Sequence, residues 1–294
     1  MLDIDLFANF RISNEERLQR LLFSYESIKN IHFNTARILI RGELASKTAV
    51  LLKAAGCEFE IILVEDDDLG WLHQTFVYTR DLPSVALFLW IEDHAAIKCT
   101  NSLKALFEDF ISSDADVMPY TFHIDKHILP YESLTIPVNY KSLRIFPVKR
   151  NSSSKSRELY ISPLPSIFKR NFFDYILLNA FSSFYRWPHY TPFNFEKLSK
   201  DVHKPVVLLA YPLDEVFVSI DDDLEYGYSL ISRGIYQSSF SRDDHRLLEG
   251  NTSSIRVFIK NSFLYKYILP LHIFRKVVVN TIRFTFVKMR KYFA

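Results

Sequence analysis

The stretch ALFLWIEDHAA, residues 86–96, decides the fold class that the sequence predicts. It starts as an uninterrupted apolar run and passes directly into Glu92, Asp93 and His94. A short continuous apolar run is typical of a strand that is buried on both faces of a parallel sheet. Ligands bind beyond the carboxyl ends of the strands in such sheets, so these three polar residues are candidate site residues. The alternative interpretation is a strand whose end is simply solvated.

The sequence around this stretch alternates in the same way between predicted strands and predicted helices. Further strands are predicted at residues 4–10, 36–42, 58–64, 84–91, 115–122 and 204–212. The segments between the first five strands have helical spacing of apolar residues, at 13–31, 45–56, 71–81 and 94–113. Ser13 or Asn14 is the predicted cap of the first helix, and Gly56 is the predicted end of the second. We therefore predict an α/β fold with a mostly parallel central sheet flanked by helices.

Missing motifs argue against several common classes of enzyme, namely Rossmann dinucleotide-binding proteins, P-loop NTPases and hydrolases with a nucleophile elbow. The six glycines form no GxGxxG, GxxxxGK[ST] or GxSxG motif, and HExxH is also absent. The two cysteines are far apart, so we expect a reducing compartment and no disulfide framework. The acidic start MLDIDLF does not resemble a signal peptide, and no apolar run reaches the roughly 18 residues of a membrane span.

Three segments together carry a resemblance to a known family. The strand end EIILVEDDD (60–68), the strand end VALFLWIEDH (85–94) and the later ADVMPY (115–120) follow one another with helices between them. This order resembles GT-A-type glycosyltransferases, of the family 2-like kind that assembles bacterial polysaccharide or lipopolysaccharide. The resemblance covers about residues 3–245 and implies a GT-A-like fold and a nucleotide-sugar donor.

The resemblance also implies a divalent cation, Mn²⁺ or Mg²⁺, bound at a DxD motif at a strand end. Glu92, Asp93 and His94 stand at that position, although the local sequence is Glu-Asp-His and not Asp-x-Asp. Carboxylate oxygens suit either cation, and the histidine favours Mn²⁺. A cation also gives a reason for clustered carboxylates, which otherwise repel one another.

Donor binding and proton transfer are assigned to other residues. In an inverting transferase the acceptor hydroxyl needs a carboxylate as its proton acceptor, and our candidates are Glu196 and Asp222. A solvated turn is the alternative for Asp222, and an exposed helix start is the alternative for Glu196. The resemblance implies that Glu65 or Asp66 binds the base or ribose of the donor. We also assign Asn9, Arg11 and Arg233 to the nucleotide sugar.

The charges of the chain are divided unequally. Residues 250–294 hold nine of the 36 Lys and Arg residues and no Asp or Glu, whereas residues 1–249 hold 27 basic and 34 acidic residues. On a helix from about Leu271, a polar stripe that includes Lys276, Arg283, Arg290 and Lys291 lies opposite Phe274, Val278 and Ile282, as in helices that lie on anionic membranes. A helix packed on the acidic body is the alternative, and the acidic body argues against nucleic acid as a partner.

These observations predict three parts and one leading function. The parts are residues 1–150, which bind the nucleotide sugar, residues 151–249 on the acceptor side, and the membrane-docking tail 250–294. The leading hypothesis is a glycosyltransferase that acts on a lipid-linked or growing polysaccharide acceptor and is peripheral at the cytoplasmic face of the cell membrane. The alternatives are a metal-dependent phospho- or nucleotidyltransferase and a non-catalytic, membrane-associated assembly subunit.

Overall fold

The computed structural model of the chain divides into two compact units, Met1–Gln237 and Ser238–Ala294. The residues that it describes are 2–65, 70–119, 138–149, 165–182, 204, 206–220 and 229–238. The predicted membrane-docking tail, residues 250–294, lies outside the described residues and stays a prediction. No helix in the described ranges is long and apolar enough to cross a membrane.

The first part of the chain alternates between strands and helices, as predicted. Its elements are β1 (Ile4–Arg11), α1 (Glu15–Ile28), β2 (Ala36–Arg41), α2 (Ala45–Ala54), β3 (Glu60–Leu63), α3 (Gly70–Thr79), β4 (Ala86–Trp90), β5 (His94–Ala96), α4 (Thr100–Ser112) and β6 (Val117–Pro119). The later elements are β7 (Val138–Asn139), β8 (Leu143–Lys149), β9 (Ser166–Lys169), α7 (Arg170–Ser182), β10 (Val206–Pro212) and β11 (Phe217–Ser219).

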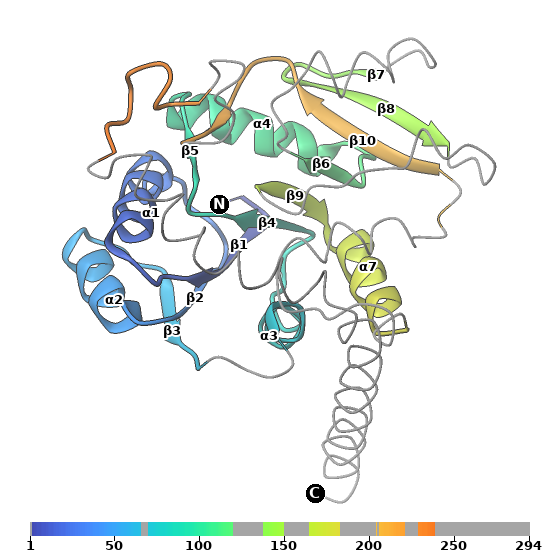
Figure 1. The fold of residues 1–294 in the computed structure, drawn as a ribbon. Coiled ribbons are helices and arrows are strands. Elements are labelled where there is room, and N and C mark those ends of the chain that lie inside the picture. Colours follow the sequence, from blue (N-terminus) through green and yellow to red (C-terminus); the bar gives the residue numbers. More distant parts are fainter. Residues whose placement is uncertain are drawn as a thin grey trace, which may run out of the picture. The chain divides into compact units, whose positions relative to one another are not determined.

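Nine of these strands form one sheet in the order β3-β2-β1-β4-β9-β6-β10-β8-β7 (Figure 1). The neighbours β3, β2, β1 and β4 are parallel, and so are β6 and β10. Strand β9 is antiparallel to both β4 and β6, and β8 is antiparallel to β10 and β7. Seven of the nine strands therefore run in one direction, which confirms the predicted mostly parallel α/β sheet.

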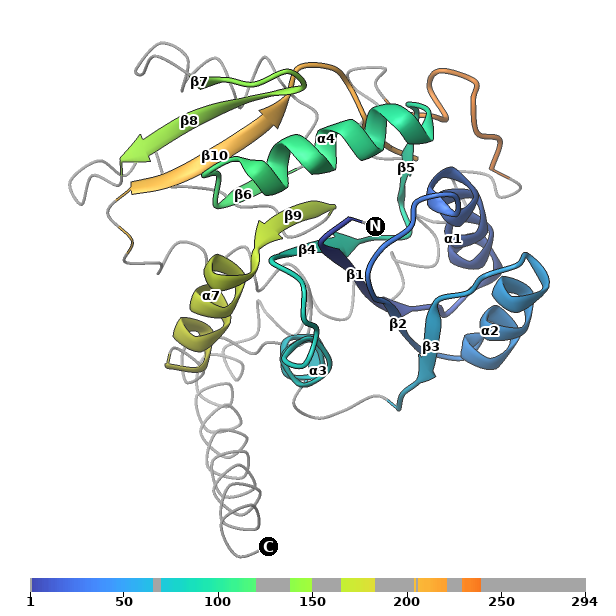
Figure 2. The same ribbon diagram turned by 180° about the vertical axis from the view of Figure 1, so that it is seen from behind.

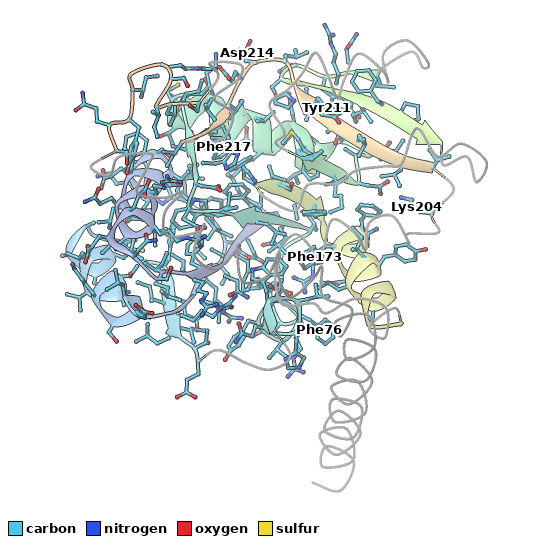
Figure 3. All side chains as sticks on the ribbon, viewed as in Figure 1. Phe76, Phe173, Lys204, Tyr211, Asp214 and Phe217 are labelled. Carbon is cyan, nitrogen blue, oxygen red and sulfur yellow. The ribbon has the colours of Figure 1, made fainter. Side chains whose placement is uncertain are left out.

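Helices cover both faces of this sheet, because alternate side chains of each strand point to opposite faces. In β1, Leu6 and Phe10 belong to a buried cluster with residues of α1, α2 and α4, whereas Phe7 belongs to a second cluster with residues of α3 and α7. Figures 1 and 2 show α1 and α4 on one side of β4, and α3 and α7 on the other. In Figure 3, Phe217 lies on the α4 side and Phe173 on the α7 side.

The buried strand predicted in ALFLWIEDHAA is present, with one correction at its start. Residues 86–90 of β4 are all buried and belong alternately to the two clusters. Val85, which we included in the strand, is 47% exposed and precedes it, because its N–H group binds the Asp3 carboxylate and its carbonyl accepts from Arg170 N. Glu92 and Asp93 follow the strand as predicted, in a turn that leads to β5.

The segment 94–113 is only partly the helix that we predicted. Residues 94–96 form β5, which pairs with β11 in a separate two-stranded sheet, and α4 begins at Thr100. Tertiary contacts override the local helical pattern here, because α1 and β11 bind the backbone of this segment from two sides.

Residues 165–182, for which the sequence predicts no element, supply β9 and α7. Strand β9 lies between β4 and β6, so residues from both sides of position 150 form one continuous sheet. The assignment of donor and acceptor roles to residues 1–150 and 151–249 stays a prediction.

Candidate active site

The connections of the sheet mark one place where a ligand is expected to bind. From β1 the chain crosses through α1 to β2 on one side of β1, and from β3 it crosses through α3 to β4 on the other side. Helices α1 and α3 lie on opposite faces of the sheet. The carboxyl ends of β1 and β4 therefore form the topological switch point, which is where open α/β sheets bind their ligands.

Charged residues from three elements meet at this switch point. Arg11 is the last residue of β1, and Glu92 follows β4 by two residues. Arg17, in the first turn of α1, donates from Nη1 to the Arg11 carbonyl oxygen at 3.2 Å and to Glu92 Oε1 at 3.4 Å. Asn14 caps this helix as predicted, because its Oδ1 accepts from Arg17 N at 2.9 Å, and the cap fixes the start of the helix at the switch point.

The turn at Glu92 and Asp93, with His94 at the start of β5, is held from two sides. On the α1 side, the Ser24 hydroxyl donates to the His94 carbonyl oxygen and accepts from Trp90 Nε1 at 2.7 Å. On the β11 side, Ile220 N donates to the Asp93 carbonyl oxygen at 2.7 Å. The bonds to the His94 and Asp93 carbonyl oxygens use backbone atoms, so they fix the path of the turn without using the Asp93 carboxylate.

The two carboxyl groups differ in their protonation. Burial raises the pKa of Glu92 to about 7, and the adjacent Asp93 charge adds to this effect. Burial also opposes ionisation of Asp93, but the hydrogen bond and charge of His94, with Arg20 and Arg17 further away, hold its pKa below its usual value. The bond from Asp93 Oδ1 to His94 Nδ1 is 2.6 Å long. Asp93, whose side chain is 35% exposed, is thus the ionised and accessible member of the pair.

Replacement of Glu92 by Gln is expected to raise the free energy of unfolding near pH 8 and to change it little near pH 5. The pKa of Glu92 is raised on folding, so the folded wild-type protein loses stability as the pH rises from about 4.5 to about 7. Gln has no such titration, and the difference should reach about 1–3 kcal/mol above pH 7. Urea unfolding at both pH values measures it. A Gln variant that is less stable at pH 8 would contradict a buried, costly charge at Glu92.

The residues at this turn fit a cation that is shared with substrate phosphates, and they do not fit a metal site formed by protein side chains alone. Within the described ranges, no set of three or more His, Cys, Asp or Glu side chains is arranged to enclose a metal ion. Mg²⁺ and similar cations are, however, often bound by one or two carboxylates together with oxygens of substrate phosphates. Asp93 and Glu92 are two adjacent carboxylates at a strand end and fit this second mode, whereas His94 Nδ1 is engaged by Asp93.

Asn9, which we assigned to donor binding, lies inside a buried polar network. Its Oδ1 accepts from Arg41 Nη1 at 2.6 Å, and its Nδ2 donates to the Trp71 carbonyl oxygen at 3.2 Å and to Thr75 Oγ1 at 3.3 Å. Arg41 Nη1 also donates to Gln74 Oε1 at 2.6 Å. With 8% exposure and both ends of its amide occupied, Asn9 is placed to join β1, β2 and α3.

The network extends to the end of β3, where the base or ribose of the donor is expected. Gln74 Nε2 donates to the Glu65 carbonyl oxygen at 3.0 Å, and the Glu65 side chain is exposed. Glu65 and Gln74 line a cavity of about 400 Å³, together with Leu63, Val64, His73, Val77 and Tyr78. Asp66, the other acid that we assigned here, lies outside the described residues.

Of the remaining predicted site residues, Arg233, Glu196 and Asp222, the structure describes Arg233 alone. Arg233 makes a two-bond ion pair with Glu215, with both N–O distances at 2.7 Å, in the segment next to β11. Its guanidinium therefore already has a carboxylate partner. Glu196 and Asp222 lie outside the described residues.

Sequence reasoning missed two residues that shape the switch point, Arg17 and Ser24. Arg17 could have been found from its position, because the positive end of the helix dipole favours acids and disfavours arginine in the first turn of a helix. Ser24 gave no comparable signal, because a serine in the middle of an amphipathic helix is common and its partners, Trp90 and His94, are distant in sequence.

Comparisons with known proteins find structural similarity and no sequence match. No protein-family model and no curated protein sequence matches the chain. Among solved structures, it is similar to S. aureus TarS 1-349 in complex with UDP-GlcNAc, with 9% identity and a TM-score of 0.44, over 80% of this chain and 61% of that one. It is also similar to the inositol-1-phosphate CTP transferase from T. maritima, with 13% identity and a TM-score of 0.44, over 80% of this chain and 95% of that one.

A third similar structure is the mannosyltransferase PcManGT from Pyrobaculum calidifontis in complex with GDP-Man and Mn²⁺. The identity is 10% and the TM-score 0.32, over 42% of this chain and 37% of that one. The chain thus spans less than two thirds of the matched TarS and mannosyltransferase chains. Glycosyltransferases and nucleotidyltransferases are both among the matched structures. At identities and TM-scores this low, the likeness assigns neither an activity nor a substrate to this chain.

Proposed function

We propose that this chain is a glycosyltransferase that moves a sugar from a nucleotide-sugar donor to a lipid-linked or growing polysaccharide acceptor. The supporting observation is the position of the Glu92–Asp93 pair. An ionised and accessible carboxylate, beside a second one, lies at the carboxyl end of β4 at the switch point of a mostly parallel sheet. This is the position at which such sheets bind nucleotides, and two adjacent carboxylates there suit a cation-bound diphosphate.

In this proposal Asp93 and Glu92 hold a divalent cation, Mn²⁺ or Mg²⁺. The bound cation would neutralise the negative charge that develops on the diphosphate leaving group. Ser24 and Ile220 keep the turn in place through its backbone, so the carboxylates need little reorganisation on binding. The exposed Glu65 side chain and the cavity beside it are the proposed place of the nucleoside.

We assign the role of proton acceptor for the acceptor hydroxyl to Asp222, with Glu196 as the second candidate. Asp222 follows Ile220 by two residues, and Ile220 N donates to the Asp93 carbonyl oxygen at 2.7 Å. Asp222 itself lies outside the described residues, so its role rests on this proximity in the sequence.

The test is a panel of nucleotide sugars, incubated with purified full-length protein and Mn²⁺ or Mg²⁺. The expected result is hydrolysis or transfer for one donor, with release of the corresponding nucleoside diphosphate. Preference for nucleoside triphosphates with release of pyrophosphate would instead favour a nucleotidyltransferase. Failure to bind any nucleotide or cation would favour a non-catalytic assembly subunit.

We also propose that residues 250–294 dock on the anionic inner face of the cell membrane and bring the site to a lipid-linked acceptor. The nine basic residues and the absence of acids support this part of the proposal. Each basic residue near such a surface contributes about 1 kcal/mol, and the attraction is screened within about 8 Å at physiological salt.

A chain that ends before Ile255 is therefore expected to bind the donor normally but to bind anionic liposomes at least 10-fold more weakly than the full chain. Binding of the full chain should fall as salt rises and should be weaker on zwitterionic liposomes, as measured by co-sedimentation. Its activity on a lipid-linked acceptor should exceed that of the shortened chain. Equal membrane binding and activity of the two chains would show that the tail has no docking role.

A further inference from the structure

Arg17 is a cation at the switch point to which neither the sequence nor the proposed function has assigned a role. It lies in the first turn of α1, and its side chain is 49% exposed. Its Nη1 atom bridges the ends of two strands, because it contacts the Arg11 carbonyl oxygen at the end of β1 and Glu92 Oε1 after β4. The guanidinium is therefore placed where the phosphates of a ligand at this point would lie.

The contact between Arg17 and Glu92 is weak in comparison with other arginine–carboxylate pairs in the same molecule. It uses one nitrogen at 3.4 Å, and that nitrogen is shared with a backbone carbonyl. Arg233 binds both oxygens of Glu215 at 2.7 Å, and Arg37 binds Glu60 at 2.7 Å. A long contact that uses one nitrogen leaves the guanidinium able to accept a better anionic partner.

The neighbouring arginine of the same helix face is arranged differently. Arg20 donates to Glu16, and both side chains are mostly buried. Its charge therefore belongs to an internal ion pair. Arg17, one turn earlier, is the more exposed of the two and extends toward the strand ends.

We propose that Arg17 binds the diphosphate of the donor, and that Glu92 and the Arg11 carbonyl hold its guanidinium in position before the donor arrives. On binding, the guanidinium exchanges Glu92 for phosphate oxygens, which leaves the Glu92 carboxylate to act with Asp93. Charge-assisted and bidentate bonds to phosphate are stronger than a shared contact at 3.4 Å, so the exchange favours binding. The inference rests on the proposed function, because it names a further donor-binding residue of the same site.

The experiment is isothermal titration calorimetry of the full-length protein with UDP, GDP, CDP, ADP and dTDP in the presence of Mn²⁺. For the diphosphate that binds best, Arg17→Ala is expected to weaken binding about 10- to 100-fold. Binding of the matching nucleoside, which has no phosphate, should change less than 2-fold. Arg17→Lys should recover part of the loss, because it restores the charge without the planar pair of donors.

Lys29→Ala is the matched control, because Lys29 is also an exposed cation but directly follows the opposite end of α1, where it pairs with Glu26. It should bind like the wild type, and thermal unfolding should show both alanine variants folded. Equal affinity of Arg17→Ala and wild type for the diphosphate overturns the role of Arg17 alone. An equal loss for nucleoside and diphosphate also overturns it. If the wild type binds no nucleoside diphosphate, the proposed function fails together with this inference.

Discussion

Asp93→Asn is expected to lower donor turnover about 100- to 1000-fold while the protein stays folded. The change removes the charge of the carboxylate that is ionised and accessible at the carboxyl end of β4. An amide oxygen can still accept the bond from His94 Nδ1, so the shape of the turn is retained. The loss should therefore come from weaker binding of the cation and the diphosphate. Release of nucleoside diphosphate at saturating donor measures the turnover, and calorimetry measures binding of Mn²⁺.

The matched control is Asp214→Asn, which removes the charge of a surface carboxylate at the connection between β10 and β11. Its side chain is 75% exposed and pairs with Lys98 at 3.3 Å, and Figure 3 shows it at the edge of the molecule. We expect this variant to keep full turnover. If Asp93→Asn also keeps full turnover, the carboxylate pair is not the cation site. If it fails to fold, as measured by circular dichroism, Asp93 has a structural role through His94.

The strands of the first half of the sheet were predictable because each is an isolated apolar run between helices. Residues 86–90 are buried on both faces, and a run of this kind has few alternatives to a strand between two layers of helices. The direction of the strands followed from the length of the connections, which is enough for a helical crossover. The carboxyl ends of the strands, and with them the place of Glu92 and Asp93, followed from the same reasoning.

Elements that depend on distant partners were not predictable in this way. Residues 94–96 continue a helical pattern in the sequence, but Ser27 of α1 and strand β11 bind their backbone and hold them as a strand. Strand β9 is short and lies between two strands that precede it in the chain by many residues. Its pairing is set by the closure of the sheet and not by any local pattern.

The residues of the candidate site were also predictable only where a local sequence pattern marks them. Acids at a strand end are visible in the sequence, since an abrupt change from apolar to acidic residues marks the edge of the sheet. The sequence does not show which polar side chains face a ligand and which bind one another. Asn9 and Arg11 are two residues apart on one strand, yet Asn9 is buried in a network and Arg11 is exposed. That difference arises from the packing of α3 against β1.

Asn9→Ala is expected to lower the free energy of unfolding by about 2–4 kcal/mol, because it removes three hydrogen bonds inside the protein. One of them is charge-assisted, from Arg41 Nη1 to Asn9 Oδ1 at 2.6 Å. Its loss leaves the buried guanidinium with one fewer acceptor, and the loss of Nδ2 also leaves the Trp71 carbonyl oxygen and Thr75 Oγ1 without that donor. For a domain of this size, such a change corresponds to a fall of about 5–15 °C in the melting temperature.

The same variant decides between the two roles considered for Asn9, since the sequence predicted donor binding and its contacts indicate support of the strand ends. In the supporting role, the folded variant at low temperature should bind the nucleoside diphosphate within a few-fold of wild type. Asn34→Ala is the control, because Asn34 is an exposed asparagine whose Nδ2 makes one bond, to Ser84 Oγ at 3.0 Å. It should cost about 1 kcal/mol or less. An Asn9→Ala protein that melts like the wild type but loses its affinity for the diphosphate would return Asn9 to the donor-binding residues, because a ligand contact contributes nothing to the stability of the free protein.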